Sequence, residues 1–503
     1  MKNKFYITTT LPYVNADPHI GFAREILEAD VLARFYRLLG DEVFFNTGTD
    51  EHGLKIHRKA EELGQDTQAY CDLKAKIFLK LKEELNLSFD NFIRTTDEEH
   101  KKAVKEFWKR SLANGNIYKK MYKIKYCVGC ELEKTESELV EGKCPLHPNM
   151  DLEAIEEENY FFRFSKYQDK LLEFYKNNPE FVVPQKRMNE IRSFVEGGLD
   201  DFSISRLKKK MPWGVPVPDD QDHVMYVWFD ALVNYISAIG WPEDMEKFNK
   251  WWPVVQLCGK DNLRQQSAMW QAMLMSVGIS ASKQIFVNGF INIGGQKMSK
   301  SLGNVISPLE MVEKFGIDGA RYLLLNSGVF GEDTDLNWEI LKEKYNADLA
   351  NGVGNLVART LAMGEKYFDG KAPEAVSDIN DLEKKWENYE EAIKVLSIHE
   401  AIGEVNGLIS SCDKFINEEA PWKLVKTDIK KLKEVIYILL ETIRHISWMV
   451  APFMPETADK IFEQLGLDLE EEKEKSFKEA KKWGGLKTGT VIKRGEGLFP
   501  RIE

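Results

Sequence analysis

Two short polar motifs, far apart in the chain, carry residue types suited to holding a polyphosphate. Pro18-His19-Ile20-Gly21 follows a β-like run over residues 5–11 and precedes a helical pattern that begins near Ala23. A helix that begins at this point directs unbonded backbone N–H groups at a phosphate. Lys297-Met298-Ser299-Lys300-Ser301 follows a pair of glycines and places two cationic side chains three positions apart. Both motifs therefore have the composition of a polyphosphate site.

A second set of residues has the spacing of metal ligands. Cys127-Val128-Gly129-Cys130 is followed by Cys144-Pro145-Leu146-His147, in the pattern C-x2-C-x13-C-x2-H. Each half is a tight knuckle, and four such ligands close a tetrahedral structural zinc site with no open position for a substrate. The alternative is three free thiols and a surface histidine. In a short polar insertion with little core, the metal would supply much of the folding energy.

Length and composition limit the class of protein. The chain has 503 residues, enough for three or four domains, with 43% hydrophobic and 30% charged residues. A net charge of −12 argues against a general nucleic-acid coat. No apolar run is long enough for a membrane span, and the N-terminus has no signal-peptide pattern, so we expect a cytoplasmic protein. The isolated thiols are expected to be small buried residues: Cys71, Cys258 and Cys412.

The elements that must position these motifs alternate in type over the first part of the chain. Residues 41–50 read as a strand that ends in the polar segment Asp50-Glu51-His52-Gly53, and residues 98–113 read as a helix. This pattern opens a parallel βαβ sheet, whose ligands bind at the carboxyl ends of its strands. Residues 115–225 break the rhythm as an insertion. We expect the α/β pattern to return at 224–229 and 254–258, and residues 284–287 then lead towards the lysine loop.

The last part of the chain reads as helical. From about Tyr345 to about residue 480 no strand is indicated, and the clearest helix break is the segment 451–455. The acidic and basic run over residues 468–482 is expected to be one exposed helix. Local basic clusters lie at residues 119–125, 206–210 and 423–433, and each is either a solvated face or a contact for nucleic acid.

Taken together, these motifs resemble the methionyl-tRNA synthetases of class I, bacterial type with a single zinc knuckle, over essentially the whole chain. The resemblance rests on the two polyphosphate motifs in this order and on the zinc knuckle within the insertion. It rests also on four further segments, which are Leu11-Pro12-Tyr13, Gly48-Thr49-Asp50-Glu51-His52-Gly53, Trp228-Phe229-Asp230-Ala231 with Tyr235, and Gly259-Lys260-Asp261.

The resemblance implies a two-step reaction. The methionine carboxylate attacks the α-phosphorus of ATP to give methionyl-adenylate and pyrophosphate, and the terminal ribose of tRNA then takes the methionyl group. Charge builds on the phosphates, so the protein needs positioning and cationic groups rather than a nucleophile of its own. Mg²⁺ should accompany the ATP, and one structural Zn²⁺ should be held by Cys127, Cys130, Cys144 and His147.

The resemblance also implies roles for single residues. Lys300 is the first choice for stabilising the transition state, with Lys297 and His19 as further catalytic residues, and Asp50 should bind the methionine ammonium. The implied ATP-binding residues are His19, Gly21, Gly259, Asp261, Lys297, Ser299 and Lys300. The implied methionine-binding residues are Leu11, Tyr13, Asp50, Trp228, Ala231, Tyr235 and Gln266.

Two positions depart from the pattern of that family. Phe22 stands where a second histidine usually closes the first motif, which removes one polar contact to ATP. Gln265-Gln266 stands where Phe-His is usual, beside the amino-acid site. Since a glutamine still donates and accepts hydrogen bonds, the second departure concerns the geometry of the pocket more than the reaction.

A further set of residues in the helical region matches the family's readers of the CAU anticodon. Asn351, Asn355 and Arg359 are four apart and so should line one face of one helix, and Trp422 begins another helix after Ala420-Pro421. Amide, guanidinium and indole groups read and stack unpaired bases. From the residues alone, a polar helix face and a core tryptophan remain the alternative.

We expect an α/β Rossmann-like catalytic domain with a zinc-binding connective insertion, followed by an all-α anticodon-binding bundle, acting on ATP, L-methionine and tRNA(Met) as a monomer. The expected division is 1–114 and 226–275 for the two catalytic halves, 115–225 for the insertion, 276–345 for the lysine-loop junction and 346–503 for the bundle with its tail. The alternatives are a class I ligase for another amino acid and a non-catalytic tRNA-binding relative. A dehydrogenase is disfavoured because no G-x-G-x-x-G follows the first strand.

Overall fold

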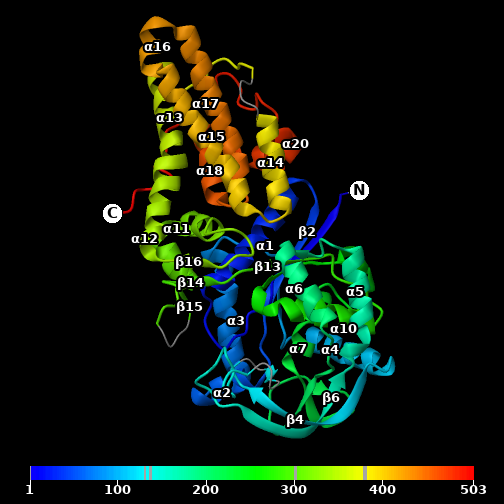
Figure 1. Ribbon diagram of the computed structural model, residues 1–503. Coiled ribbons are helices and arrows are strands. Elements are labelled where there is room, and N and C mark those ends of the chain that lie inside the picture. The colour runs from blue at the N-terminus through cyan, green and yellow to red at the C-terminus, as the bar shows by residue number, and fades with distance from the viewer. Residues whose placement is uncertain (1, 130–131, 135–138, 299–302, 378–381) are drawn as a thin grey trace.

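The computed structural model describes residues 2–129, 132–134, 139–298, 303–377 and 382–503. The predicted zinc ligand Cys130 and the predicted ATP contacts Ser299 and Lys300 lie outside these residues. A bundle of helices stands at one end of the molecule, and an antiparallel ribbon lies at the other end, beyond a parallel sheet (Figure 1). None of the described helices combines the length and the apolar character that crossing a membrane requires.

The central sheet is parallel and has the strand order β3-β2-β1-β12-β13-β7. Its strands are β1 (Lys4–Thr8), β2 (Glu42–Thr49), β3 (Asn91–Arg94), β7 (Val182–Val183), β12 (Val255–Gly259) and β13 (Gln284–Asn288). The order of strands reverses between β1 and β12, and a ligand of such a sheet binds outside the carboxyl ends at that point. The predicted fold class and the predicted strand at residues 41–50 are confirmed.

Helices cover the faces of this sheet and bury its apolar strands. They are α1 (Ile20–Leu38), α2 (Leu54–Glu62), α3 (Thr67–Glu84), α4 (Glu98–Ala113), α7 (Val227–Ala231), α8 (Asn234–Ser237), α9 (Met245–Trp251), the short turn η3 (Lys260–Asn262), the π-helical segment η4 (Gln265–Met269) and α10 (Trp270–Ser276). The helix predicted at residues 98–113 is confirmed as α4. A parallel sheet that is covered on both faces needs continuously apolar strands, and β1 and β12 are almost wholly buried.

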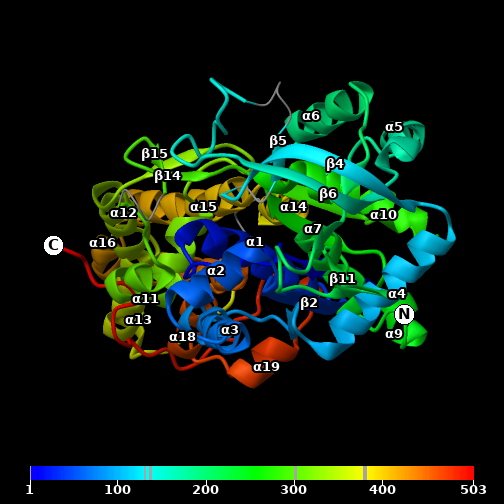
Figure 2. The ribbon, with the colours of Figure 1, turned by 90° about the horizontal axis from the view of Figure 1, so that it is seen from below.

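The insertion forms two antiparallel sheets. The larger has the order β5-β4-β6-β8, built from β4 (Ile117–Cys127), β5 (Leu132–Lys134), β6 (Glu153–Phe162) and β8 (Phe202–Ser203), and its long β4–β6 ribbon lies near α7 (Figure 2). The smaller contains β9 (Ser205–Leu207), β10 (Pro216–Val217) and β11 (Asp220–Met225). Three helical segments lie between these strands: η2 (Phe164–Tyr167), α5 (Gln168–Asn177) and α6 (Gln185–Glu196).

The segment 224–229, where the α/β pattern was expected to return, is divided between two elements. β11 ends at Met225 within the smaller antiparallel sheet and α7 begins at Val227, so the segment adds no strand to the parallel sheet. A short apolar run cannot be assigned to a buried strand or a buried helix by periodicity alone. The helix matters for the site, since it carries Trp228.

The junction after the parallel sheet contains β14 (Ile291–Ile293), β15 (Gln296–Lys297), α11 (Pro308–Leu325), β16 (Thr334–Leu336) and α12 (Trp338–Lys344). Two charged side chains of α11 hold the bundle. The fully buried Arg321 donates to Asp30 on α1 at 2.8 Å and to the Phe453 carbonyl at 2.7 Å. Asp318 accepts the Thr457 N–H at 2.6 Å. The helix that bears the first polyphosphate motif is thereby bonded to the bundle through one arginine.

The C-terminal region is helical, as predicted. Its elements are the π-helical segment η6 (Tyr345–Val353), α13 (Gly354–Phe368), α14 (Leu382–Lys394), α15 (Ile398–Glu419), α16 (Pro421–Thr427), α17 (Ile429–Val450), α18 (Pro455–Gln464), α19 (Leu469–Glu474) and α20 (Phe477–Ala480). The single exposed helix expected over 468–482 is wrong. Ser476 begins a new helix with a capping box, and Glu472 and Phe477 are buried.

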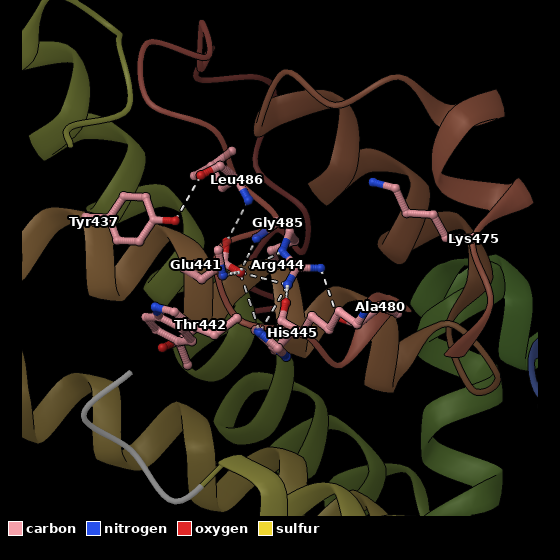
Figure 3. A network of polar contacts seen from close by, with 12 residues as sticks. Tyr437, Glu441, Thr442, Arg444, His445, Lys475, Ala480, Gly485 and Leu486 are labelled. Atoms are coloured by element: carbon pink, nitrogen blue, oxygen red, sulfur yellow. Dashed lines mark hydrogen bonds and ion pairs between the residues drawn. The ribbon is translucent and has the colours of Figure 1, made fainter. Parts of the chain in front are cut away.

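A buried cluster of polar groups, which we call the Glu441 cluster, fixes the C-terminal tail to α17 (Figure 3). The Glu441 carboxylate accepts two hydrogen bonds from Arg444, at 3.0 and 2.7 Å. It also accepts the backbone N–H groups of Gly484, Gly485 and Leu486, each at 2.9 Å. Glu441 and Arg444 are both almost wholly buried, so the tail replaces water as their partner.

Candidate active site

A cavity of about 550 Å³ opens at the switch point of the parallel sheet, between β1 and β12. It collects residues from both halves of the sheet and from the lysine loop. Every described residue that the sequence assigned to ATP or methionine lines it: Leu11, Tyr13, His19, Gly21, Asp50, Trp228, Ala231, Tyr235, Gly259, Asp261, Gln266 and Lys297.

The first polyphosphate motif forms the start of α1. His19 is the N-cap residue, and its Nδ1 accepts the Gly21 N–H at 3.1 Å. A Cβ atom at Gly21 would lie 2.9 Å from the His19 ring and 3.5 Å from the end of Met298. A side chain at position 21 would therefore have to displace the His19 ring from its capping position. The backbone N–H groups expected to be unbonded have partners at two positions. The Gly21 N–H donates to His19, and the Ile20 N–H donates to the Ile306 carbonyl at 3.1 Å, so the expectation is wrong there.

Glu25 lies in the cavity and was missed by the sequence reasoning. Its carboxylate accepts the backbone N–H of Thr10 at 2.8 Å and the Thr10 hydroxyl at 2.6 Å, which connects the end of β1 to α1. Burial raises the pKa of Glu25 to about 8, although the two bonds from Thr10 lower it in part. Glu25 is four residues after Gly21, on the same helix face, and that spacing was a signal in the sequence.

The Asp50 segment is joined to the residues before the first motif. The Val14 N–H donates to the Asp50 carbonyl at 3.1 Å, and the Asp50 N–H donates to the Pro12 carbonyl at 3.0 Å. The next residue, Glu51, is fully buried and forms a bidentate ion pair with Arg94 at 2.7 and 2.8 Å. This pair holds the loop that carries Asp50 against β3.

Asp230 fixes the helix that carries Trp228. Its two carboxylate oxygens bind two histidines from different elements, His52 Nδ1 at 2.5 Å and His100 Nε2 at 2.9 Å. Burial alone would raise the pKa of Asp230, but these two histidines outweigh it and lower that pKa to about 2. The carboxylate therefore stays charged, and it connects α7, α4 and the loop after β2 beneath the cavity.

The side chains of Tyr235 and Gln266 form the inner wall of the cavity. The Gln266 amide donates to the Tyr235 hydroxyl at 2.6 Å, and both side chains are almost wholly buried. The Tyr6 hydroxyl donates to the Tyr235 carbonyl at 2.9 Å, which anchors the backbone of α8 to β1. The departure at Gln266 thus leaves a direct hydrogen bond to an aromatic wall of the cavity.

The described part of the lysine loop lies at the cavity mouth. Lys297 is the last residue of β15, and its ammonium lies 4.3 Å from the centre of the Phe290 ring. Lys260 lies at the same distance from Phe290 and pairs with Asp333 at 2.7 Å. Lys300 and Ser299 lie outside the described residues, so the structure does not test their assignment.

The predicted metal ligands come together at the end of the β4 strand. The ligand atoms of Cys127, Cys144 and His147 all lie within 4.8 Å of one another. His147 Nδ1 lies 3.8 Å from the Cys127 sulfur and 4.0 Å from the Cys144 sulfur, near the separation of about 3.6 Å that a shared tetrahedral zinc imposes. The donor set of thiols and one imidazole fits a structural zinc. Cys130 lies outside the described residues.

The residues predicted to read an anticodon lie on the surface of the bundle. Trp422, in the first turn of α16, keeps 47% of its surface exposed, which excludes the core-packing alternative. Asn351 and Asn355 are exposed, and Arg359 pairs with Asp413 on α15 at 3.4 Å. The expectation of one continuous helix is wrong, because η6 is π-helical with a non-helical Gly352 before α13 begins.

Comparison with known proteins identifies relatives of the whole chain. The family model described as "tRNA synthetases class I (M)" matches residues 5–153 and 149–361, and the model described as "Anticodon binding domain of methionyl tRNA ligase" matches residues 369–503. The methionine–tRNA ligase of Thermotoga maritima is 44% identical over 514 aligned positions, which cover 99% of this chain and 80% of the relative.

Solved structures agree with these matches. The Mycobacterium tuberculosis methionyl-tRNA synthetase in complex with methionyl-adenylate is 39% identical, with a TM-score of 0.94 over all of both chains. Its apo form is 35% identical, with a TM-score of 0.86 over 100% of this chain and 99% of the other.

Proposed function

Since the chain belongs to the methionyl-tRNA synthetase family, we propose that the cavity between β1 and β12 is where it activates methionine. The activity is the ATP-dependent attachment of L-methionine to tRNA through methionyl-adenylate, and the ATP is used with Mg²⁺. The observation that carries the proposal is that all described residues expected to bind ATP or methionine line one cavity. The relatives and solved structures named above are all methionine-specific, which favours this function over a ligase for another amino acid.

In the amino-acid half of the cavity, Asp50 binds the methionine ammonium. Its loop is held on one side by the bonds to residues 12–14 and on the other by the Glu51–Arg94 ion pair. Leu11, Tyr13, Trp228, Ala231 and Tyr235 enclose the thioether chain, and Gln266 supports Tyr235. Aromatic walls suit a polarizable sulfur.

In the nucleotide half, His19, Gly21, Gly259 and Asp261 hold ATP. A Cβ at position 259 would lie 2.7 Å from the Asp261 carboxylate, so a larger residue there would have to displace that side chain. Lys297, Ser299 and Lys300 hold the phosphates, with His19, Lys297 and Lys300 as the catalytic residues. Positioned cations stabilise the charge that develops on the phosphates, while the methionine carboxylate supplies the nucleophile.

Cys127, Cys130, Cys144 and His147 hold one structural zinc at the tip of the insertion. Three of the four ligand atoms already lie together, and a Cβ at Gly129 would lie only 2.5 Å from the His147 ring. When bound, the metal supplies folding energy to a segment with little core of its own. Metal analysis of the purified protein tests this assignment, and the absence of zinc would overturn it.

Asn351, Asn355, Arg359 and Trp422 read the CAU anticodon of tRNA(Met). An exposed indole beside lysines 423 and 426 is a stacking platform in a basic surface. We divide the chain as the sequence suggested, into catalytic halves at 1–114 and 226–275, an insertion at 115–225, a junction at 276–345 and a bundle at 346–503. Two strands of the parallel sheet, β7 and β13, come from the ranges of the insertion and the junction. The cytoplasm supplies all three substrates, and we propose it as the site of action.

One experiment tests the assignment of the cavity. ATP–pyrophosphate exchange is measured for each amino acid, with the natural chain and with Asp50→Asn. We expect exchange with methionine alone, and a rise in the KM for methionine of about tenfold or more when the charge at Asp50 is removed, since hydrogen bonds to charged groups contribute about 1.5–3 kcal/mol. An unchanged KM would remove Asp50 from the ammonium site.

A further inference from the structure

Four buried polar side chains form a continuous chain of hydrogen bonds behind the Tyr235 wall of the cavity. Gln271 lies on α10, Ser282 precedes β13, Gln256 lies on β12 and Gln266 lies on η4. Their exposed fractions are 0%, 4%, 0% and 3%, in that order. Such groups are costly to bury unless every donor finds an acceptor. That requirement determines the direction of each hydrogen bond.

The direction is fixed at the far end by two backbone groups. The Ser282 N–H donates to Gln271 Oε1 at 3.0 Å, and a backbone N–H can only donate. Gln271 Nε2 then faces two acceptors, the Gln266 carbonyl at 2.8 Å and Ser282 Oγ at 3.2 Å. A carbonyl can only accept, so the amide of Gln271 has one orientation in which all three contacts are satisfied.

The direction then passes towards the cavity. Ser282 Oγ has accepted a bond from Gln271, and its proton goes to Gln256 Oε1 at 2.5 Å. Gln256 Nε2 donates to Gln266 Oε1 at 2.9 Å, and Gln266 Nε2 donates to the Tyr235 hydroxyl at 2.6 Å. If the side-chain amides of Gln256 and Gln266 were turned so that nitrogen and oxygen exchanged places, the Ser282 proton would have no acceptor among the described neighbours.

The last hydroxyl in the chain still has its own proton to place. The Tyr235 oxygen accepts from Gln266 and also interacts with the Asn234 amide, so its proton points away from these two donors, and Tyr235 lines the cavity. Burial raises the pKa of Tyr235 well above its usual value, so the phenol keeps that proton. A thioether sulfur is a weak acceptor with no proton to donate.

We propose that Gln256, Ser282 and Gln271 are positioning residues that, through Gln266, hold the Tyr235 hydroxyl as a hydrogen-bond donor towards the substrate side chain. The proposal rests on the function proposed for this cavity. Its consequence is selectivity: a site that is built to donate a hydrogen bond disfavours an analogue that lacks the acceptor. Norleucine, in which a methylene replaces the sulfur of methionine, is such an analogue.

The test compares ATP–pyrophosphate exchange with methionine and with norleucine. Gln256→Met and Ser282→Ala interrupt the chain away from the cavity. Gln265→Met is the matched control, because Gln265 is buried next to Gln266 and its Oε1 has no partner among the described residues. We expect the ratio of kcat/KM values, methionine over norleucine, to fall about threefold to tenfold in both interrupted variants and to hold in the control.

The cause of the loss is separated from a general structural effect in two ways. The fall should come from a higher KM for methionine with kcat retained, and Tyr235→Phe should lose the same selectivity. The double variant of Gln256→Met with Tyr235→Phe should lose no more than either change alone, since both break one chain.

Three results would overturn the proposal: an unchanged ratio in Ser282→Ala, an equal fall in Gln265→Met, or additive losses in the double variant. If Gln256→Met does not fold, Ser282→Ala, which removes a single oxygen, carries the test. Failure of the natural chain to exchange with methionine would instead overturn the proposed function, and so the two failures are distinguishable.

Discussion

Two buried polar regions of this molecule use their hydrogen-bonding groups in opposite ways. In the Glu441 cluster the carboxylate accepts bonds from Arg444 and from three backbone N–H groups of the tail. In the wall of the cavity, the indole N–H of Trp228 and the side-chain carbonyl of Asn234 have no partner among the described residues. The first region satisfies its polar groups within the protein, whereas the second leaves two polar groups without a partner among the described residues.

Because their hydrogen-bonding partners differ, the two regions contribute differently to the stability of the free protein. A buried ion pair with all its bonds made contributes little net stability, but losing one partner leaves an uncompensated charge. A buried donor or acceptor without a partner costs about 1–3 kcal/mol in the free protein. Where a ligand supplies the missing partner, that cost is recovered on binding, and the group then favours the bound state over the free one.

Changing Glu441 should therefore have the largest effect on stability and little effect on catalysis. Glu441→Gln keeps the shape but removes the charge opposite Arg444 and places an amide donor against backbone donors. We expect a loss of about 3–5 kcal/mol, seen as a lower denaturation midpoint, with methionine-dependent exchange retained at 25 °C. Glu434→Gln is the control, two turns earlier on α17 and partly exposed.

The same variant carries a pH signature. Burial alone would raise the pKa of Glu441, but the bonds from His445, Arg444 and the Leu486 N–H outweigh it and hold that pKa well below its usual range. A group with a depressed folded-state pKa stabilises above its unfolded pKa of about 4.3, and that stability is lost as the pH falls below it. The difference between the natural chain and Glu441→Gln should thus shrink below about pH 4.3. A difference that is constant with pH would contradict the cluster's role.

Lys300 provides the opposite case. Lys300→Ala should slow adenylate formation by about a hundredfold to a thousandfold, because loss of one positioned charge contact costs about 2.7–4 kcal/mol in the transition state. The denaturation midpoint should not change, since the loss concerns a charge meant for ATP. Exchange at the natural rate would remove Lys300 from the mechanism, and a lowered midpoint would make it a structural residue.

The sequence predicted the residues that line the cavity better than the residues that hold those lining residues in place. His19, Asp50 and Trp228 belong to short motifs, so the sequence predicted them together, and all three line the cavity. The pairing of Asp230 with His52 and His100 joins three elements that are distant in the chain, and no spacing in the sequence predicts it. The supporting contacts depend on tertiary packing, which local pattern does not carry.

The errors in secondary structure have the same origin. The apolar run at 224–229 is divided between β11 and α7, and periodicity alone does not place that boundary. The π-helical η6 and the kink at Gly352 interrupt a pattern that fits a regular helix. Glu25, in contrast, was available from its spacing and was overlooked.

Trp422 extends the comparison to the surface of the helical bundle. Trp422 is exposed, unlike Glu441, and is proposed to stack on an anticodon base. Such stacking contributes about 1–3 kcal/mol per base, so Trp422→Ala should lower aminoacylation of tRNA(Met) about tenfold or more. Exchange needs no tRNA and should be nearly unchanged. If exchange and aminoacylation fell together, the loss would not be specific to tRNA, and the proposed stacking role of Trp422 would be wrong.

The smallest expected effect bears most directly on the unpartnered groups of the cavity. An unpartnered indole N–H also occurs at the fully buried Trp108, which does not line the cavity, so a missing partner alone does not mark a ligand contact. Trp228→Phe removes the N–H at the cavity and Trp108→Phe removes the one in the core. If position on the cavity decides, only Trp228→Phe should raise the KM for methionine, by about threefold to tenfold, since one hydrogen bond contributes about 0.5–1.5 kcal/mol. Neither variant should lose more stability than the packing of its smaller ring explains, because each removes an unsatisfied donor. If both variants kept the natural KM for methionine, the Trp228 N–H would make no contact with the substrate. The cavity wall would then be complete without a ligand, as the Glu441 cluster is.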